Sequence, residues 1–260
     1  MSRVVTLTTD FGSSSGYVAE LKGRLLHARG GCTLVDVSHD VPPQDIRHAA
    51  WLAGRACLAF PPGTLHVLVV DPGVGTARRL VWARLGAADD RQEFLCPDNG
   101  ILSLALERLP LIAAREIPVP PAVSATFHGR DVIAPAAVRL LDGAAPETLG
   151  PARPDLVRIP WPRPLETAAG IAGEVIHVDA FGNLLTNLPA ELWPRLAAAG
   201  RLLVGGREVT RLVRTYADAP QGTLVALVGS QGCIEVAVVE GRADARVAAT
   251  VGTAVTLPPA

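Results

Sequence analysis

Polar residues follow several apolar segments of the chain, at positions where a β-strand is expected to end. Asp10 follows the β-branched segment Arg3–Thr8, and Asp71 directly follows the apolar run Leu65–Val70. Asn99 and His128 come after later strand-like segments. Because ligands bind at the carboxyl ends of strands in an open α/β sheet, we expect these side chains at one functional edge. Carboxylate, amide and imidazole groups together suit either acid–base work on a water molecule or metal ligation.

Asp71 and His128 are the strongest candidates on position alone. Pro72 and two glycines follow Asp71, and no helix pattern begins there, so the carboxylate is not explained as a helix cap. His128 lies in a loop just before the last helix pattern of the first half. Asp98 and Asp131 stand immediately before helix patterns, so capping and function both remain open for them. Four other histidines are interpreted as structural: His27, His48, His66 and His177.

Several common site motifs are absent from the sequence. It contains neither of the glycine-rich phosphate-binding patterns, no H-E-x-x-H or C-x-x-C spacing, and no G-x-S-x-G elbow. A zinc site is therefore unsupported, and no metal ligands are assigned. The four cysteines are far apart and are expected to be small buried hydrophobes: Cys32, Cys57, Cys96 and Cys233.

Two polar islands interrupt the apolar strands of the second half. They are Asp179–Asn183 and Gly229–Gly232. Phe181 and Asn183 in the first island would suit a purine, because the ring stacks on the base and the amide reads its edge. A plain hairpin turn is the alternative, and the residues alone favour it.

Composition and charge narrow the class of protein. The chain has 260 residues, 49% of them apolar and 19% charged, with a formal net charge of −1. These values exclude a disordered chain and argue against nucleic acid as a partner. No signal peptide is evident, and no apolar run approaches the ~18 residues of a membrane helix. We therefore expect a soluble cytoplasmic protein without a membrane partner.

The elements that must position these residues fall into two groups. Residues 1–150 alternate strand-like and helix-like patterns, which predicts an α/β domain with a central, mostly parallel sheet flanked by helices. The helix patterns are Tyr17–Leu25, Ile46–Cys57, Gly100–Arg108 and Asp131–Leu141. Five prolines crowd residues 151–166, the composition of a stiff linker. Residues 167–260 contain short strands, glycine-bearing turns and one helix pattern at Leu188–Ala198, which predicts a smaller all-β, barrel-like domain.

Seven motifs in order carry a family resemblance. They are Thr9–Gly12, Asp36–Ile46, Val70–Gly75 with Arg78, Pro97–Leu102, Phe127–Asp131, Asp179–Asn187 and Gly229–Val238. Together they span Thr8 to about Leu257, and the chain resembles the S-adenosyl-L-methionine hydroxide adenosyltransferases, relatives of the fluorinase and chlorinase. The resemblance implies hydrolysis of S-adenosyl-L-methionine to adenosine and L-methionine. S-adenosyl-L-methionine is then the substrate, and no cofactor is needed. The resemblance also implies a homotrimer with active sites between subunits.

The resemblance also implies roles for particular residues. It makes Asp71, Arg78 and His128 the catalytic group around the nucleophile. Further matching positions contact the substrate: Asp10 at the ribose hydroxyls, Asp179 at the amino-acid portion, Phe181, Asn183 and Ser230 at adenine or methionine, and Tyr216 as an additional aromatic wall.

Other functions remain open at this stage. A halogenase of the same fold has a tyrosine at the position of Asp71 and Tyr-Ser in place of His128-Gly129. Gln231, where fluorinases have a basic residue, is a local departure with no assigned consequence. A non-catalytic adenosine-binding protein would not need the catalytic group. A metal-dependent phosphoesterase would use a set of five ligands: Asp10, Asp71, Asp98, Asn99 and His128. A methyltransferase is disfavoured because no glycine-rich turn follows the first strand.

Overall fold

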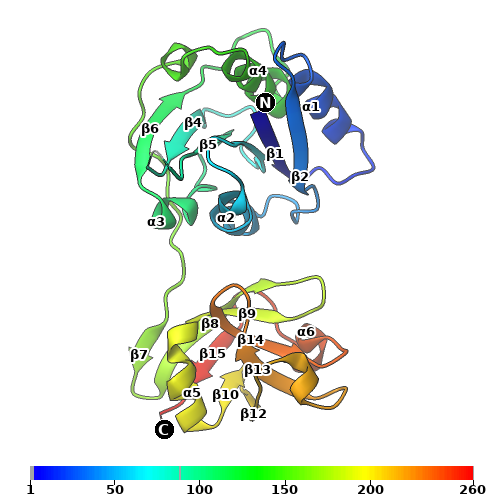
Figure 1. The fold of residues 1–260 in the computed structure, drawn as a ribbon, viewed down its shortest axis with the longest axis vertical. Helices are drawn as coiled ribbons and strands as arrows, with labels where there is room; N and C mark the ends of the chain where they lie inside the picture. Colours follow the sequence, from blue (N-terminus) through cyan, green and yellow to red (C-terminus); the bar gives the residue numbers. More distant parts are fainter. Residues whose placement is uncertain (1–2, 88, 260) are drawn as a thin grey trace. The chain divides into compact units, whose positions relative to one another are not determined.

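The computed structural model of the protein describes residues 3–87 and 89–259, which form two compact units that divide between Trp161 and Pro162 (Figure 1). In the first unit the elements are β1 Arg3–Thr9, α1 Tyr17–Leu25, β2 Cys32–Ser38, α2 Ile46–Gly54, β3 Leu65–Val69, β4 Leu80–Leu85, β5 Gln92–Pro97, α3 Ala105–Arg108, β6 Leu111–Glu116 and α4 Ala134–Leu141. In the second they are β7 Leu165–Thr167, β8 Gly170–Val178, β9 Leu184–Pro189, α5 Trp193–Ala199, β10 Leu202–Val204, β11 Arg207–Val209, β12 Arg211–Leu212, β13 Leu224–Val228, β14 Cys233–Val238, α6 Ala243–Val247 and β15 Ala254–Leu257.

The sheet of the first unit is mixed. Its strand order is β2-β1-β3-β5-β4-β6, with parallel pairings among β2, β1, β3 and β5 and antiparallel pairings of β4 with both β5 and β6. The prediction of a mostly parallel sheet is therefore corrected. The reason is local, since β4 and β5 follow each other without a helix between them. A short connection joins antiparallel strands, whereas a parallel pair needs a long crossover.

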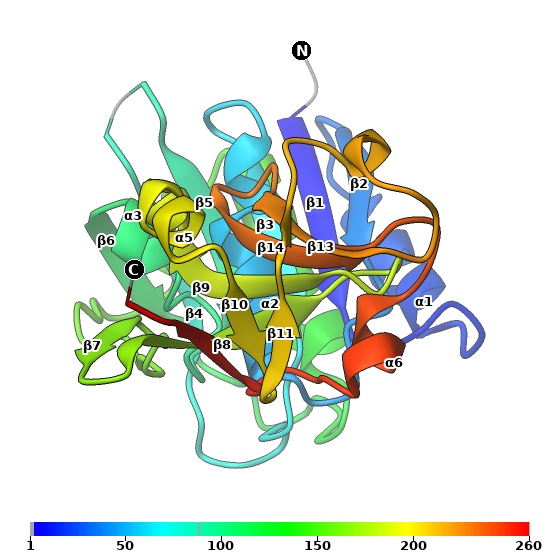
Figure 2. The same ribbon diagram turned by 90° about the horizontal axis from the view of Figure 1, so that it is seen from below.

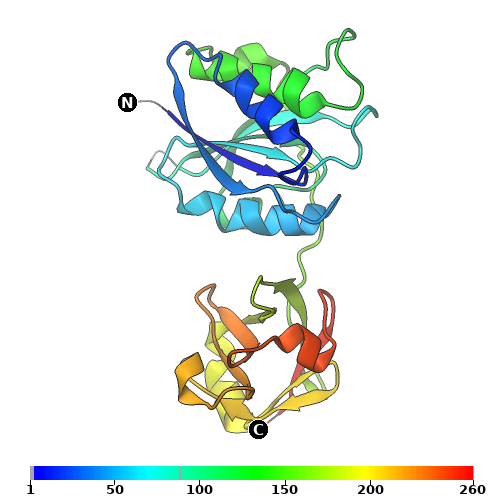
Figure 3. The same cartoon turned by 90° about the vertical axis from the view of Figure 1, so that its right-hand side faces the viewer.

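Helices cover both faces of this sheet, as the alternating pattern predicted. Figure 3 shows α1 and α4 on one side of the sheet and α2 on the other. Strand β3 and the residue after it are buried on both faces. Val67 and Val69 pack in the core under α1 and α4, whereas Leu68 and Val70 pack in the core under α2 and α3. A strand buried on both faces explains why this segment is almost uniformly apolar.

Two predicted helices differ at their starts. The pattern Gly100–Arg108 is mostly turns, and only Ala105–Arg108 is α-helical. The first three residues of the pattern Asp131–Leu141 belong to a π-helical turn, Gly129–Ile133, which runs into α4. Such π turns are rare and occur often at functional sites.

The proline-rich segment packs partly on the first unit. The backbone N–H of Val157 donates to Asp98 over 2.8 Å, and that of Ile159 donates to Ser103 over 2.8 Å. The Trp161 ring stacks on Trp51, with centroids 6.3 Å apart. The division between the units therefore falls inside residues 151–166, after Trp161.

The second unit is a nearly closed, barrel-like sheet of nine strands. Its order is β11-β10-β15-β8-β9-β14-β13-β12, with β7 paired to β8 (Figure 2). Its main apolar core receives Leu196 from α5 and Val247 from α6. A second, smaller cluster is formed by Val213, Val225, Leu227, Ala237 and Val239. The expectation of a smaller all-β unit after the α/β unit is confirmed at this level.

The prediction of a helix at Leu188–Ala198 places its start too early. Leu188 and Pro189 end β9, and α5 begins only at Trp193. Pro194 lies in the first turn of α5, where its missing N–H costs nothing. Within the described residues, no helix is long and apolar enough to cross a membrane.

Candidate active site

Three polar side chains meet at the edge of the first sheet where β3 ends. Asp71 lies two residues beyond β3, Arg78 lies two residues before β4, and His128 precedes the π-helical turn. Nε of Arg78 donates to Asp71 Oδ1 at 2.9 Å and to Oδ2 at 3.0 Å, and Nη2 donates to Oδ2 at 2.5 Å. Nη2 also lies 2.8 Å from Nδ1 of His128. Two residues predicted from strand ends and one from the resemblance thus form a single cluster.

The loop between Asp71 and Arg78 is held by its own hydrogen bonds. The backbone N–H of Val74 donates to the Asp71 carbonyl, and the Thr76 hydroxyl donates to the Gly73 carbonyl over 2.6 Å. Gly75 has φ +79°, and a Cβ there would lie 2.6 Å from the carbonyl oxygen of Ala125. Glycine is therefore required on both conformational and steric grounds. The loop keeps the ion pair in a fixed geometry.

The ion pair is largely removed from water. The side chains of Asp71 and Arg78 are 7% and 10% exposed. A two-pronged Arg–carboxylate contact is stronger and more directional than a single hydrogen bond. Nη1 of Arg78 is buried, and among the described residues it has no hydrogen-bond partner. The guanidinium thus retains donor capacity for a ligand.

His128 is held as a neutral imidazole in one tautomer. The residue is 4% exposed, and burial lowers its pKa, to which the positive charge of Arg78 adds a further lowering, against opposing effects of Asp71 and Asp131. Because a guanidinium can only donate, Nδ1 must accept from Arg78, and the ring proton lies on Nε2. His128 can therefore donate a hydrogen bond from Nε2.

Asp10 lies at the same edge of the sheet. Thr9 pairs with Val69 in the β1–β3 register, so Asp10 and Asp71 follow neighbouring parallel strands. Oδ2 of Asp10 accepts a hydrogen bond from the backbone N–H of Gln44 over 2.9 Å. Gln44 has φ 67°, a strained conformation for a residue with a side chain. The Asp10 carboxylate thus anchors the loop that precedes α2.

An aromatic cluster connects the Asp10 segment to the His128 segment. The rings of Phe11 and Phe127 meet edge to face with centroids 5.5 Å apart, and Tyr17 contacts both. The residues next to Asp10 and His128 therefore pack against each other. This packing brings the two loops to one place on the first unit.

Two candidates left open from the sequence have structural partners. Asp98 accepts from Arg79 Nε over 2.8 Å and from the Val157 backbone, and Asp131 forms a two-pronged contact with Arg130. In the described parts of the chain, no three His, Cys, Asp or Glu side chains are grouped to hold a metal ion.

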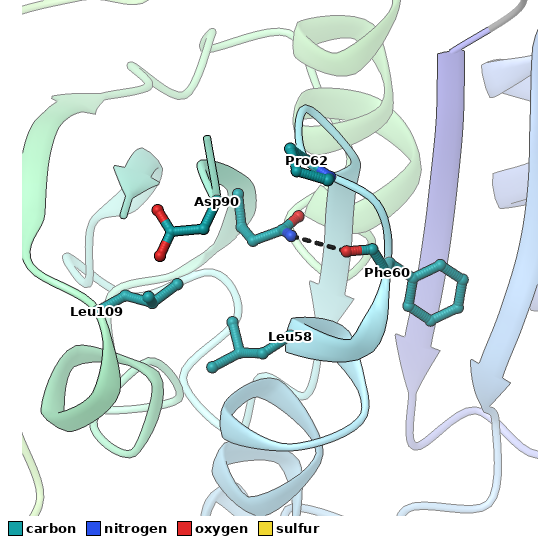
Figure 4. A pocket seen from close by; sticks show the side chains of 6 residues that line it. Leu58, Phe60, Pro62, Asp90 and Leu109 are labelled. Atoms are coloured by element: carbon teal, nitrogen blue, oxygen red, sulfur yellow. Dashed lines mark hydrogen bonds between the residues drawn. The ribbon is translucent and has the colours of Figure 1, made fainter. Parts of the chain in front are cut away.

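A separate pocket of about 280 Å³ lies near the opposite edge of the sheet, close to the starts of β3 and β5 (Figure 4). Leu58, Pro62 and Leu109 are among its lining residues, and its Gln92 amide donates to the Phe60 carbonyl over 2.9 Å. Its lining contains none of the predicted site residues.

In the second unit, Asp179 organises the turn between β8 and β9. Its Oδ1 accepts from the backbone N–H groups of Phe181 and Asn183, each over 2.9 Å, and its Oδ2 accepts from the Asn183 side-chain amide over 3.0 Å. The hairpin-turn interpretation is therefore correct. This turn also leaves the Phe181 ring 75% exposed, available to a ligand.

Ser230 and Tyr216 lie on other turns of the second unit. Ser230 is in the tight turn between β13 and β14, where the Gly229 N–H donates to the Cys233 carbonyl. The Tyr216 side chain is 42% exposed, and its hydroxyl donates to Oε1 of Glu235 over 2.5 Å. Glu235 was missed from the sequence. Its signal was a carboxylate inside the otherwise apolar strand β14.

Comparisons with known proteins match both units of the chain to the same family. The model of the SAM hydroxide adenosyltransferase N-terminal domain matches residues 5–150, and the C-terminal domain model of the same family matches residues 173–256. The (R)-S-adenosyl-L-methionine hydrolase of Thermus thermophilus is 41% identical over 93% of this chain and 94% of its own. A fluorinase from an Actinoplanes strain is 30% identical over 90% of each chain.

A solved structure has the same fold. The crystal structure of an uncharacterized conserved protein from Thermotoga maritima matches with a TM-score of 0.87 and 32% identity, over 96% of this chain and 98% of that one. Since the two family models cover most of the described residues in the expected order, this chain belongs to the SAM hydroxide adenosyltransferase family.

Proposed function

We propose that this protein hydrolyses S-adenosyl-L-methionine to adenosine and L-methionine, with a water molecule attacking the 5′ carbon of the ribose. The observation that carries this proposal is the buried Asp71–Arg78–His128 cluster at the ligand-binding edge of the first sheet. The (R)-S-adenosyl-L-methionine hydrolase of Thermus thermophilus, which matches this chain over nearly its whole length, supports the proposal.

The cluster offers an acceptor and donors for one water molecule. The Asp71 carboxylate accepts a hydrogen bond from the water, and Nε2–H of His128 donates to the water oxygen. Arg78 neutralises Asp71 and stabilises negative charge that develops on the attacking oxygen. With these contacts, one lone pair of the water is directed toward the carbon, and positioning supplies much of the rate.

The reaction balances without a cofactor. The water oxygen forms a bond to C5′ while the C5′–S bond breaks, and that electron pair stays on sulfur as the neutral thioether of methionine. The water proton passes through Asp71 to solvent. One sulfonium cation and one water thus give adenosine, methionine and a proton. The sulfonium is already a good leaving group, so the protein has little need to activate it.

The remaining site residues bind the substrate in this proposal. Asp10 accepts hydrogen bonds from the ribose hydroxyls, and Asp179 faces the ammonium of the methionyl portion. The exposed rings of Phe181 and Tyr216 stack on adenine, whereas Asn183 and Ser230 contribute hydrogen bonds to adenine or the amino acid. The proposed substrate is cationic, which matches these carboxylates.

We further propose that the protein acts as a homotrimer. The catalytic cluster is on the first unit, and the proposed adenine-stacking residues are on the second. An active site between the first unit of one subunit and the second unit of the next would use both. The family resemblance supports this arrangement.

Halogenation is the runner-up activity, and Gly129 argues against it. Halogenases of this fold have a serine after the residue that replaces His128. Here a Cβ at position 129 would lie 2.9 Å from Cγ1 of Val69, so a side chain there requires repacking. The Asp71 carboxylate would also repel a halide ion.

Incubation of the purified protein with S-adenosyl-L-methionine tests the function. We expect adenosine and methionine in equal amounts, unaffected by a chelator and by chloride, bromide or fluoride. A 5′-halogenated nucleoside would instead support the halogenase activity, and S-adenosylhomocysteine would support methyl transfer. Tight adenosine binding without turnover would leave only the binding-protein alternative.

A further inference from the structure

We propose that Glu235 is a positioning residue for the nucleoside site: its buried carboxylate holds the Tyr216 hydroxyl, and so fixes the ring on which adenine stacks. The inference rests on the proposed function only in naming adenosine as the ligand. Glu235 is not itself proposed to touch the substrate.

Glu235 is an unusual residue for its place in the fold. It is 5% exposed on strand β14, which pairs with β9 on one side and β13 on the other. A carboxylate is almost never buried this far without a partner. Its partner is the Tyr216 hydroxyl, which donates to Oε1 over 2.5 Å. A short hydrogen bond to a carboxylate is among the stronger ones in proteins.

The second carboxylate oxygen is placed beneath the turn that carries Ser230. An added Cβ at Gly229 would collide with Oε2 of Glu235, so the carboxylate can keep its observed position only while residue 229 is a glycine. Glu235 therefore sits between the Ser230 turn and the Tyr216 segment. Both belong to the proposed binding surface.

The backbone of Tyr216 is already fixed by other contacts. The Thr215 hydroxyl and the Asp218 carboxylate cap the short helix Tyr216–Asp218 reciprocally, and Asp218 also accepts from the Arg214 backbone. What these contacts leave free is the side-chain rotation of the half-exposed ring. The bond to Glu235 restricts that rotation.

Asp179 lies close enough to act on both members of the pair. Its negative charge raises the pKa of Glu235 and of Tyr216, in each case adding to a larger effect of burial. The turn of Phe181 and Asn183 thus approaches the Tyr216–Glu235 pair from β8 and β9. A fixed Tyr216 ring and the exposed Phe181 ring are then available to the same nucleoside. A pre-set ring lowers the entropy lost on binding.

The experiment measures adenosine affinity by calorimetry and the kinetics of S-adenosyl-L-methionine hydrolysis for Glu235→Ala, Glu235→Gln and Tyr216→Phe. Glu235→Ala removes the acceptor, and we expect adenosine affinity to fall and KM to rise about tenfold, with kcat within about twofold. Glu235→Gln keeps an acceptor oxygen and the same size, so it should restore most of the affinity. Glu208→Ala, an exposed carboxylate of the same unit paired with Arg201, is the matched control and should change neither.

Double variants separate positioning from general stability. In the Tyr216→Phe background the hydroxyl is gone, so Glu235→Ala should change adenosine affinity by less than about twofold, against about tenfold in the wild-type background. Equal adenosine affinity for all variants, or losses that simply multiply, would overturn the inference, as would a wild-type protein that does not bind adenosine. If the variants show the predicted pattern of adenosine affinities but the protein does not hydrolyse S-adenosyl-L-methionine, the positioning role of Glu235 is supported and the proposed hydrolase activity is wrong.

Discussion

Nη2 of Arg78 donates to Nδ1 of His128 over 2.8 Å, and this contact determines which imidazole nitrogen can face a ligand. Since Nδ1 accepts, Nε2 carries the proton and acts as a donor. His128 therefore orients the nucleophile rather than taking its proton through Nδ1. The same guanidinium nitrogen also donates to Asp71, so one arginine sets the orientation of both neighbours.

The first prediction concerns the pH dependence of kcat. Burial and the charge of Arg78 lower the pKa of His128, so its neutral form persists below the usual histidine value of about 6.5. As the pH falls, kcat should stay level through that value and decline only at lower pH, when a proton on Nδ1 displaces the Arg78 contact. A His128→Gln variant should lose this acid limb. A decline centred at or above about 6.5 would contradict the assigned neutral state.

The second prediction separates the two members of the ion pair. Asp71→Asn keeps the shape but weakens the acceptor, and we expect kcat to fall about 100-fold with KM changed little. Arg78→Lys cannot donate to Asp71 and His128 with the same planar fork, so a similar loss is expected. Arg79→Lys is the control, because Arg79 pairs with Asp98 and Asp155 instead. An Arg79→Lys loss as large as that of Arg78→Lys would argue that stability, not catalysis, is being measured.

The third prediction tests whether active sites span subunits. Asp71→Asn disables the first unit, and Asp179→Ala disables the second. In a co-expressed mixture of the two chains, sites built from neighbouring subunits should recover about a quarter of wild-type activity. Each variant alone should show only its low residual activity. No recovery in mixed oligomers, with exchange verified by two affinity tags, would mean that each chain builds its own site.

The fourth prediction concerns the close contact behind His128. Gly129→Ala places a Cβ 2.9 Å from Cγ1 of Val69 and should lower the free energy of unfolding by about 1–3 kcal/mol. Val69→Ala removes the obstructing methyl groups. The double variant should therefore be more stable than the sum of the single losses, by about 1 kcal/mol in urea unfolding. Strict additivity would show that the two positions do not compete for space.

The sequence predicts the position of the site better than its internal geometry. Asp71 and His128 stand out because strand ends and loops can be located from hydrophobic patterns. Arg78 does not stand out in the sequence, because its guanidinium contacts Asp71 only after the chain has folded. Asp98 and Asp131 look equally suitable in sequence, yet their carboxylates are occupied by Arg79 and Arg130. Which arginine pairs with which carboxylate depends on the tertiary structure.

The second unit was harder to predict for a related reason. Strand β9 and helix α5 are joined by the short segment Ala190–Leu192, and the pairing of Pro189 with Cys233 shows where the strand ends. Glu235 is buried on the face of β14 opposite to Ile234 and Val236, which join the main core, and a buried strand position usually holds an apolar residue. Its function as an acceptor for Tyr216 depends on a contact 19 residues away in the chain.

Hydrolysis in water enriched in ¹⁸O tests the central claim most directly. If a water molecule held by the Asp71–Arg78–His128 cluster attacks C5′, mass spectrometry should find one ¹⁸O atom in the 5′-hydroxyl of adenosine and none in methionine. The Asp71→Asn variant should form the same labelled product more slowly. Label found instead in the amino-acid product, or adenosine that carries no label, would contradict attack by water at the 5′ carbon.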